Sequence, residues 1–260
     1  MKFIYEIALC FLAIFVATPG TCADVTRNQF LCGIAQGYPP YQFQDETGEP
    51  TGLDVDVLRL VFEKLGKKMT IRQDKWDTIV GDLCFGDLDC VGGMEINETR
   101  KQCFDFTTPY YHRQITVFLL AYNMEILDIN DLKWTIIAGD RHSQVEQLFT
   151  EKDLKNKIRI FQTESKDKSM QMLKEGTVVA VVMPKAVGFH LAKKHELDVK
   201  ILDTSAPKSP VGIAVKKGNK ELLNLLEAAL LELRKDGTLD AVLKKWRVQG
   251  TTDTNGLKPH

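Results

Sequence analysis

Arg100 is the residue whose type and position most directly indicate chemistry. It follows a short apolar segment and a turn, which would place it at the carboxyl edge of a sheet, where α/β proteins bind their ligands. A guanidinium there can donate two parallel hydrogen bonds to a carboxylate, a geometry that lysine cannot match. The alternative is a surface arginine at the start of a helix. We therefore expect a site for a small carboxylate, with Arg100 as its main contact.

Two aromatic residues, Tyr38 and Trp76, are candidates for stacking on the same ligand. An aromatic ring can stack on an alkyl stem or on a cationic group. Packing in a core or a turn is the commoner role of such residues and is the competing interpretation for both. Tyr41 is a weaker candidate, because a Pro-Pro-Tyr step is readily explained by packing.

The elements that must position these residues alternate regularly between strand and helix. After a strand at 30–35, residues Val57, Leu58, Val61 and Phe62 share one face of an expected helix, 55–65. Further strands are expected at 69–72 and 89–93, and a further helix at 76–85. Such alternation is typical of parallel sheets with crossover helices.

A second run of the same kind follows, with strands expected at 115–121, 134–138 and 178–183. Ser143 and Glu146 have capping-box spacing, which predicts a helix over 143–149. A third portion holds a strand at 211–215, a helix at 220–235 and a short helix ending near Trp246. The central strands bracket a middle block, so we predict two lobes joined by two hinge strands: 24–115 with 210–260, and 116–209.

The first 23 residues have the layout of a secretory signal peptide. Lys2 precedes an apolar run over 7–17, a Pro-Gly break follows, and Thr21-Cys22-Ala23 offers a cleavage site. A retained anchor is the alternative, although the apolar run is short for a span that needs about 20 residues. A lipid-modified Cys22 is a minor alternative, because the expected aliphatic residue before it is missing.

Composition and cysteine usage limit the other function classes. The chain has 260 residues and a formal net charge of −1, which argues against nucleic acid or an acidic membrane surface as the partner. Cleavage would leave four cysteines, which permit two disulfides in three connectivities or remain as buried thiols. Their spacing does not fit a zinc site. These four are Cys32, Cys84, Cys90 and Cys103.

Five segments, in order and spanning almost all of the expected mature chain, resemble the family 3 extracellular solute-binding proteins of amino-acid ABC transporters. They are GYPPYQF at 37–43 with GEPTGLDVDV at 48–57, WDTIVGDL at 76–83, GDLDCVGGMEINETR at 86–100 running on to FTTPYY at 106–111, GTVVAVV at 176–182, and GTLDAVLKKW at 237–246. The resemblance implies an α/β, two-lobed periplasmic-binding-protein-like fold, each lobe a mainly parallel sheet flanked by helices.

The resemblance also implies roles for individual residues. Arg100 matches the arginine that binds the ligand α-carboxylate, and Tyr38 and Trp76 match positions that sandwich the ligand side chain. Backbone groups of a loop formed by Gly93, Met94 and Glu95 would face the cleft. From the second lobe, the N-terminus of the helix beginning near Ser143 would meet the carboxylate. The family usually has a small turn before that helix, so Arg141 and His142 depart from the pattern.

Two further positions depart from the pattern of amino-acid binders. Pro184 stands where the family places an aspartate that pairs with the ligand ammonium, and Glu95 stands where it prefers serine or threonine. A desolvated ammonium without a partner costs several kcal/mol. We hypothesise that Glu95 supplies the missing carboxylate. The competing interpretation is a ligand with a carboxylate and no amine.

The resemblance implies a periplasmic binding protein that acts as a monomer, closes over a small amino acid or related metabolite, and delivers it to an ABC transporter permease. No catalytic residue, metal or other cofactor is expected. A cyclohexadienyl dehydratase that acts on prephenate or arogenate is the enzymatic alternative, with Glu95 or His142 as general acid. A sensory ligand-binding domain is a third class, which would normally be followed by a membrane segment.

Overall fold

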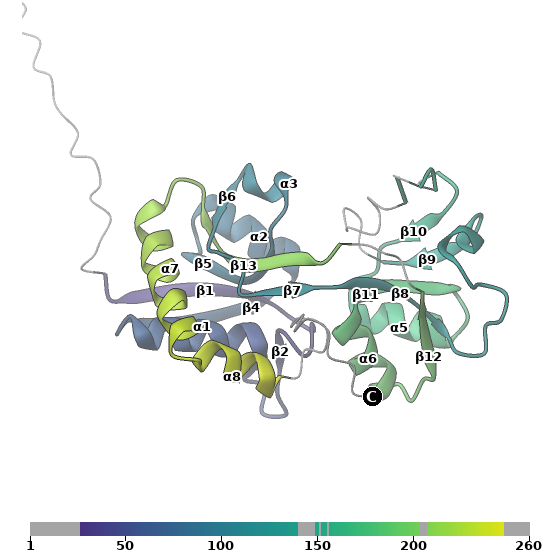
Figure 1. Ribbon diagram of the computed structural model, residues 1–260, viewed down its shortest axis with the longest axis horizontal. Coiled ribbons are helices and arrows are strands. Elements are labelled where there is room, and N and C mark those ends of the chain that lie inside the picture. The colour runs from purple at the N-terminus through teal and green to yellow at the C-terminus, as the bar shows by residue number, and fades with distance from the viewer. Residues whose placement is uncertain (1–26, 140–148, 151, 155, 203–206, 247–260) are drawn as a thin grey trace, which may run out of the picture.

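The computed structural model describes residues 27–139, 149–150, 152–154, 156–202 and 207–246. Strands β2 (Phe43–Gln44) and β3 (Pro50–Thr51) form a small sheet of their own. The remaining strands form two larger sheets, which lie side by side in Figure 1. The first has the order β4-β1-β5-β13-β6, with β7 also paired to β13. Its strands are β1 (Gln29–Ala35), β4 (Lys68–Asp74), β5 (Cys90–Glu95), β6 (Phe104–Phe106), β7 (Tyr111–Arg113) and β13 (Ser209–Lys216).

The second sheet has the order β10-β9-β11-β8-β12. In the first sheet every strand except β13 runs in one direction, and in the second every strand except β8 does. The expectation of two mainly parallel sheets is therefore confirmed. The strands of the second sheet are β8 (Ile115–Leu120), β9 (Ile136–Ala138), β10 (Arg159–Phe161), β11 (Ala180–Pro184) and β12 (Val199–Leu202).

The chain passes twice between the two sheets, each time into the strand that runs opposite to its neighbours, β8 or β13. Strand β7 continues through Gln114 into β8 of the second sheet, and the chain returns after β12 into β13 of the first. Near this boundary β7 and β13 pair antiparallel, with Arg113 opposite Ser209 and Tyr111 opposite Val211. The two-lobed α/β architecture with two connecting strands is thus confirmed (Figure 1).

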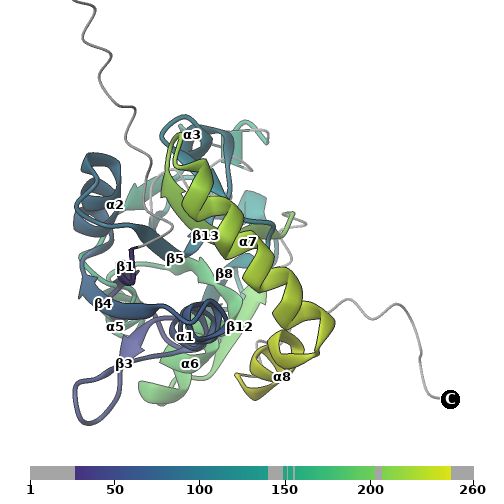
Figure 2. The same ribbon diagram turned by 90° about the vertical axis from the view of Figure 1, so that its left-hand side faces the viewer.

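Helices cover both faces of the first sheet, and the alternation of side chains along its strands decides which core each residue joins. In β5, Cys90 packs toward α1 and α7, whereas Val91 packs toward α2. Figure 2 shows α1 and α7 on one side of the strands and α2 on the other. The helices of this part are α1 (Leu53–Lys64), α2 (Trp76–Phe85), α3 (Glu98–Lys101), α7 (Lys220–Lys235) and α8 (Thr238–Lys245).

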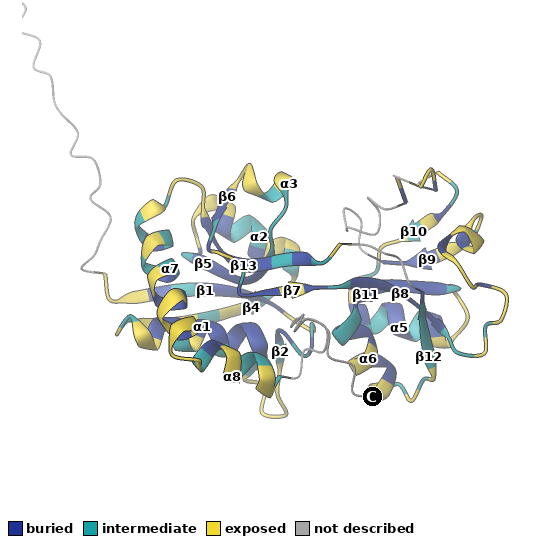
Figure 3. Cartoon of the chain, viewed as in Figure 1, coloured by how far each residue is buried: buried dark blue, intermediate teal, exposed yellow. Residues whose placement is uncertain are grey.

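The second sheet is also buried on both faces, as the apolar run at 178–183 predicts. All of β11 is buried (Figure 3). Its residues Val181 and Met183 face α5 (Lys166–Lys174) and α6 (Lys185–Lys194). Ala180 and Val182 face the other side, beneath the 3-10 helix η1 (Ile129–Leu132).

Several boundaries differ from expectation. Strand β9 begins at Ile136 and not at 134, because Trp134 has a φ of 65°, a left-handed conformation that a strand cannot contain. Residues 143–148 of the expected helix 143–149 and the whole of the expected signal peptide lie outside the described residues. No helix in the described parts of the chain has the length and apolar character that crossing a bilayer needs.

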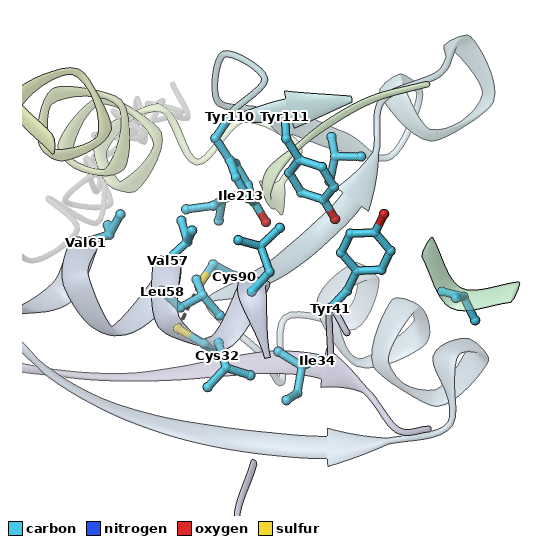
Figure 4. Close-up of a cluster of buried hydrophobic side chains, with 14 of the residues drawn as sticks. Cys32, Ile34, Tyr41, Val57, Leu58, Val61, Cys90, Tyr110, Tyr111 and Ile213 are labelled. Carbon is cyan, nitrogen blue, oxygen red and sulfur yellow. Dashed lines mark hydrogen bonds between the residues drawn. The ribbon is translucent and has the colours of Figure 1, made fainter. Parts of the chain in front are cut away.

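The four cysteines of the expected mature chain have free thiols in this structure. Cys32 of β1 and Cys90 of β5 are register partners on adjacent parallel strands, both fully buried, with their sulfur atoms 2.7 Å apart (Figure 4). Cys84 and Cys103 are exposed. Cys32 and Cys90 are therefore buried together, whereas Cys84 and Cys103 face solvent, a difference that the sequence spacing did not indicate.

Asp105 in β6 ties the sheet to the turn before α7. Its carboxylate accepts a hydrogen bond from the Gly218 amide at 2.9 Å and lies 3.1 Å and 2.9 Å from the ammonium groups of Lys217 and Lys220. The Gly218 hydrogen bond and these two lysines lower the pKa of Asp105 from 3.8 to about 2. The pKa of Asp105 is therefore lower in the folded state than in the unfolded state. Ionisation of Asp105 thus stabilises the fold at pH values above its unfolded-state pKa.

We predict that Asp105→Asn lowers the free energy of unfolding by about 1–2 kcal/mol at pH 7. The difference from the wild type should shrink as the pH falls from about 5 toward 2, where the native carboxyl becomes protonated. Denaturant unfolding across this pH range measures it. A difference that stays constant with pH would show that Asp105 does not act through its charge.

Candidate functional site

The candidate site lies where three neighbouring strands of the first sheet end. Strands β4, β1 and β5 are adjacent and parallel, so their carboxyl ends meet at one edge. Trp76 follows β4, Tyr38 follows β1, and Glu95 is the last residue of β5. In open α/β sheets this edge is where ligands bind. The topology therefore brings most of the expected site residues to one place.

Arg100 is held at this edge by its own short helix, α3. The Asn97 side chain caps the helix by accepting a hydrogen bond from the Arg100 amide at 2.9 Å. The Arg100 guanidinium donates to the Glu95 carbonyl at 2.9 Å and stacks on Trp76, 5.3 Å from the ring centroid. Arg100 is half-buried. Arg100 thus follows the expected strand near the carboxyl edge of the sheet, and its guanidinium contacts Trp76.

Gly93 and Met94 occupy a different position from the one expected. Together with Glu95 they belong to strand β5 and not to a loop, because β13 pairs with β5 as far as Glu95. The Met94 side chain is fully buried in the core beneath α2. Gly93 lies against the Asp54 side chain, where a β-carbon would come within 2.0 Å of a carboxylate oxygen. Neither side chain is available to a ligand, and the expected contact through the backbone groups of these residues stays a prediction.

A buried ion pair that sequence reasoning missed lies directly behind Gly93. The Asp54 carboxylate, at the start of α1, is fully buried, and one of its oxygens lies 3.0 Å from a terminal nitrogen of Arg113. The same carboxylate accepts hydrogen bonds of 2.6 Å from both the Tyr110 hydroxyl and the Gln42 amide. Burial raises the pKa of Asp54, while Arg113, Tyr110 and Gln42 oppose that shift.

Three tyrosine rings enclose the Arg113 guanidinium. Its central carbon lies 4.4 Å from the ring centroid of Tyr41, 5.0 Å from that of Tyr38 and 5.3 Å from that of Tyr111. The rings of Tyr41 and Tyr111 are stacked, with centroids 5.3 Å apart (Figure 4). Arg113 also donates a hydrogen bond to the Tyr111 hydroxyl. We call these three tyrosines, with Asp54 and Glu95, the Arg113 enclosure.

Glu95 therefore has a cationic neighbour within the protein. Its carboxylate lies 3.9 Å from a terminal nitrogen of Arg113, and its side chain is 18% exposed. The sequence indicated Glu95 as a partner for a ligand cation or as a general acid, and not as a neighbour of Arg113. In the structure Tyr38 and Glu95 thus contact Arg113, and Trp76 contacts Arg100.

Pro184 closes strand β11 of the second sheet and is buried. It pairs in register with Ile115, the first residue of β8, and the next amide, that of Lys185, donates to the Gln114 carbonyl at 2.8 Å. Pro184 thus lies beside the strand that connects the two lobes. The other expected contacts from the second lobe, His142 and Ser143, lie outside the described residues.

One signal in the sequence could have found Asp54. It stands three, four and seven residues before Val57, Leu58 and Val61, so it shares the apolar face of their helix. A carboxylate on a buried face needs a charged or hydrogen-bonding partner. The identity of that partner, 59 residues away at Arg113, had no comparable signal.

We predict that Gly93→Ala destabilises the protein by about 3 kcal/mol or more, because the new methyl group would collide with Asp54 and Gln42. Gly176→Ala is the matched control. Gly176 has a φ of 70°, against 69° for Gly93, but no atom lies within 4 Å of the point that a β-carbon at residue 176 would occupy. This control substitution should therefore cost only about 1 kcal/mol of backbone strain. Equal losses in thermal or denaturant unfolding would contradict the packing described for Gly93.

Known proteins resemble this chain over most of its length. The L-cystine-binding protein TcyJ of Escherichia coli K12 is 27% identical over 222 residues, covering 85% of this chain and 83% of that protein. A probable amino-acid ABC transporter-binding protein of Haemophilus influenzae is 28% identical and covers 94% and 96%. A solved structure of an ancestral arginine-binding protein bound to glutamine superposes with a TM-score of 0.78 at 33% identity, covering 86% and 99%.

The family model for bacterial extracellular solute-binding proteins, family 3, matches residues 30–249. This match takes in both sheets, the connecting strands and the edge that carries Arg100. It agrees with the resemblance seen in the sequence motifs and with the two-lobed fold. The chain belongs to family 3 of the bacterial extracellular solute-binding proteins.

Proposed function

We propose that this solute-binding protein captures an amino acid or a closely related carboxylate between its two lobes and delivers it to an ABC transporter permease. The observation that carries the proposal is Arg100, fixed at the carboxyl end of β5 by its cap and by Trp76. A carboxylate at this edge would accept two parallel hydrogen bonds from the guanidinium. The names of the similar proteins support the ligand class.

The lobes of this proposal are residues 24–115 with 210–260, and residues 116–209. Tyr38, Trp76 and Arg100 contribute from the first lobe, while His142 and Ser143 contribute from the second. Closure would be a rotation about the connecting strands, with the ligand shifting the population toward the closed form. The monomer is the proposed binding unit, since one chain supplies both lobes.

Solute binding is favoured over the dehydratase alternative. The three similar proteins reported above are binding proteins, and the one carboxylate at the edge considered as a general acid, Glu95, faces Arg113. This supports a protein that binds its ligand without transforming it.

We predict that Arg100→Lys weakens binding of the best ligand about tenfold or more, because an ammonium cannot form the paired hydrogen bonds of a guanidinium. Isothermal titration calorimetry against a panel of amino acids and small carboxylates measures the affinities. Arg27→Lys is the control, since Arg27 also stacks on a ring, that of Phe30, but lies before the amino end of β1. Equal affinities for Arg100→Lys and the wild type would contradict the assigned role.

We also propose that residues 1–23 are removed on export and that Cys32 and Cys90 then form a disulfide. Register partners on adjacent strands are about 4.8 Å apart, within the range of about 4.4–6.8 Å that a disulfide spans. The two thiols would lose two protons and two electrons to an oxidised dithiol partner of the exported compartment, which becomes reduced. Their burial implies that oxidation precedes the completion of folding.

Protein purified from the exported fraction should begin at Asp24. Under denaturing conditions without reductant, its Cys32 and Cys90 should resist alkylation, whereas both react after reduction. Peptide mass spectrometry reads both results, with cytoplasmic protein expressed without residues 1–23 as the reduced control. Full alkylation of Cys32 and Cys90 in the exported protein without reductant would contradict the disulfide.

A further inference from the structure

The Arg113 enclosure has the composition of a binding site for a cation. Three aromatic rings surround one guanidinium, and two carboxylates, those of Asp54 and Glu95, lie at 3.0 Å and 3.9 Å from its terminal nitrogens. Proteins recognise cationic ligands with such aromatic surfaces and acidic groups. In this chain the cation is supplied by the protein itself.

The enclosure overlaps the proposed ligand site. Tyr38 follows β1 and Glu95 ends β5, so both belong to the edge that carries Arg100 and Trp76. Arg113 reaches this edge from β7, next to the boundary between the two sheets. Its guanidinium therefore takes both the ring face of Tyr38 and the nearest charge of Glu95, the two features that would otherwise attract a cationic ligand group.

Arg113 cannot readily be displaced from this position. Its side chain is only 4% exposed, and the Asp54 carboxylate that it neutralises is completely buried. Removing one partner of a buried ion pair leaves an uncompensated charge, which is strongly unfavourable. A cationic ligand group would thus have to approach a fixed positive charge or to strip Asp54 of its partner.

We propose that Arg113 is a specificity-determining residue that excludes ligands with a cationic side chain and directs the site toward neutral or acidic ones. This inference rests on the proposed function, because it concerns the ligand of the same site. It separates this chain from a binder of basic amino acids, even though an ancestral arginine-binding protein is similar to it in sequence and fold.

Calorimetric titration of the wild-type protein with L-glutamine, L-glutamate, L-cystine, L-arginine and L-lysine tests the inference. At least one neutral or acidic ligand should bind, and arginine and lysine should bind about 100-fold more weakly or not at all. Arginine or lysine bound as tightly as the best neutral ligand overturns the inference and leaves the proposed function standing. No binding to any of the five contradicts the proposed function, and the inference falls with it.

The variant Arg113→Ala vacates the enclosure and should raise the affinity for arginine about tenfold or more, because Asp54 and the tyrosine rings are then open to a ligand guanidinium. Arginine should also raise the melting temperature of this variant and not that of the wild type. If the single variant fails to fold, the double variant Asp54→Asn with Arg113→Ala removes both charges of the buried pair. The tyrosine rings and Glu95 remain in this variant, so it should still bind arginine more tightly than the wild type does, and an unchanged affinity overturns the inference. Arg27→Ala, which removes another arginine stacked on a ring, is the matched control. Unchanged arginine affinity in folded Arg113→Ala overturns the inference.

Discussion

The buried ion pair between Asp54 and Arg113 is the constraint on which the organisation of the first lobe depends. A carboxylate with no solvent exposure is unfavourable unless a counter-charge and hydrogen bonds compensate it. Arg113 supplies the charge, and Tyr110 and Gln42 supply hydrogen bonds. Gly93 makes the arrangement possible, because only a residue without a side chain fits against the carboxylate.

This ion pair also links the candidate ligand site to the strands that join the two lobes. Asp54 lies in the first turn of α1, whereas Arg113 ends β7 and pairs with Ser209 of the returning strand β13. The same contact therefore fixes the first helix relative to the strands that lead into and out of the second lobe. Tyr38 stacks on the same guanidinium, so the position of a proposed ligand contact depends on this ion pair.

The sequence predicted the main elements of the first lobe but fewer of the second, where α5, α6, β10 and β12 had no predicted counterpart. It predicted the long-range pairings of the strands poorly. Helices α2 and α7 have the predicted bounds, and each ends close to a glycine with positive φ, Gly86 or Gly237, which is a local stop signal. The segment 93–95 was wrongly expected to be a loop, since its pairing with β13 joins residues more than 100 positions apart. Periodicity reports one element at a time and carries no such information.

In the candidate site, too, the local features were predictable from the sequence and the long-range contacts were not. Arg100 could be placed from its own segment, because a strand, a turn and a short capped helix are local features. The enclosure around Arg113 could not, because its members come from four separate segments that only the fold brings together. Of these residues, Asp54 alone has a recognisable signal in the sequence, because it is a carboxylate on the apolar face of a helix.

A double-mutant cycle on Asp54 and Arg113 tests the central claim most directly. The variants are Asp54→Asn, Arg113→Gln and their combination, each measured by denaturant unfolding at pH 7. A buried pair that organises the lobe should give a coupling free energy of about 2 kcal/mol or more, with the double variant more stable than the sum of the single losses predicts. Losses that add to within about 0.5 kcal/mol would contradict the account.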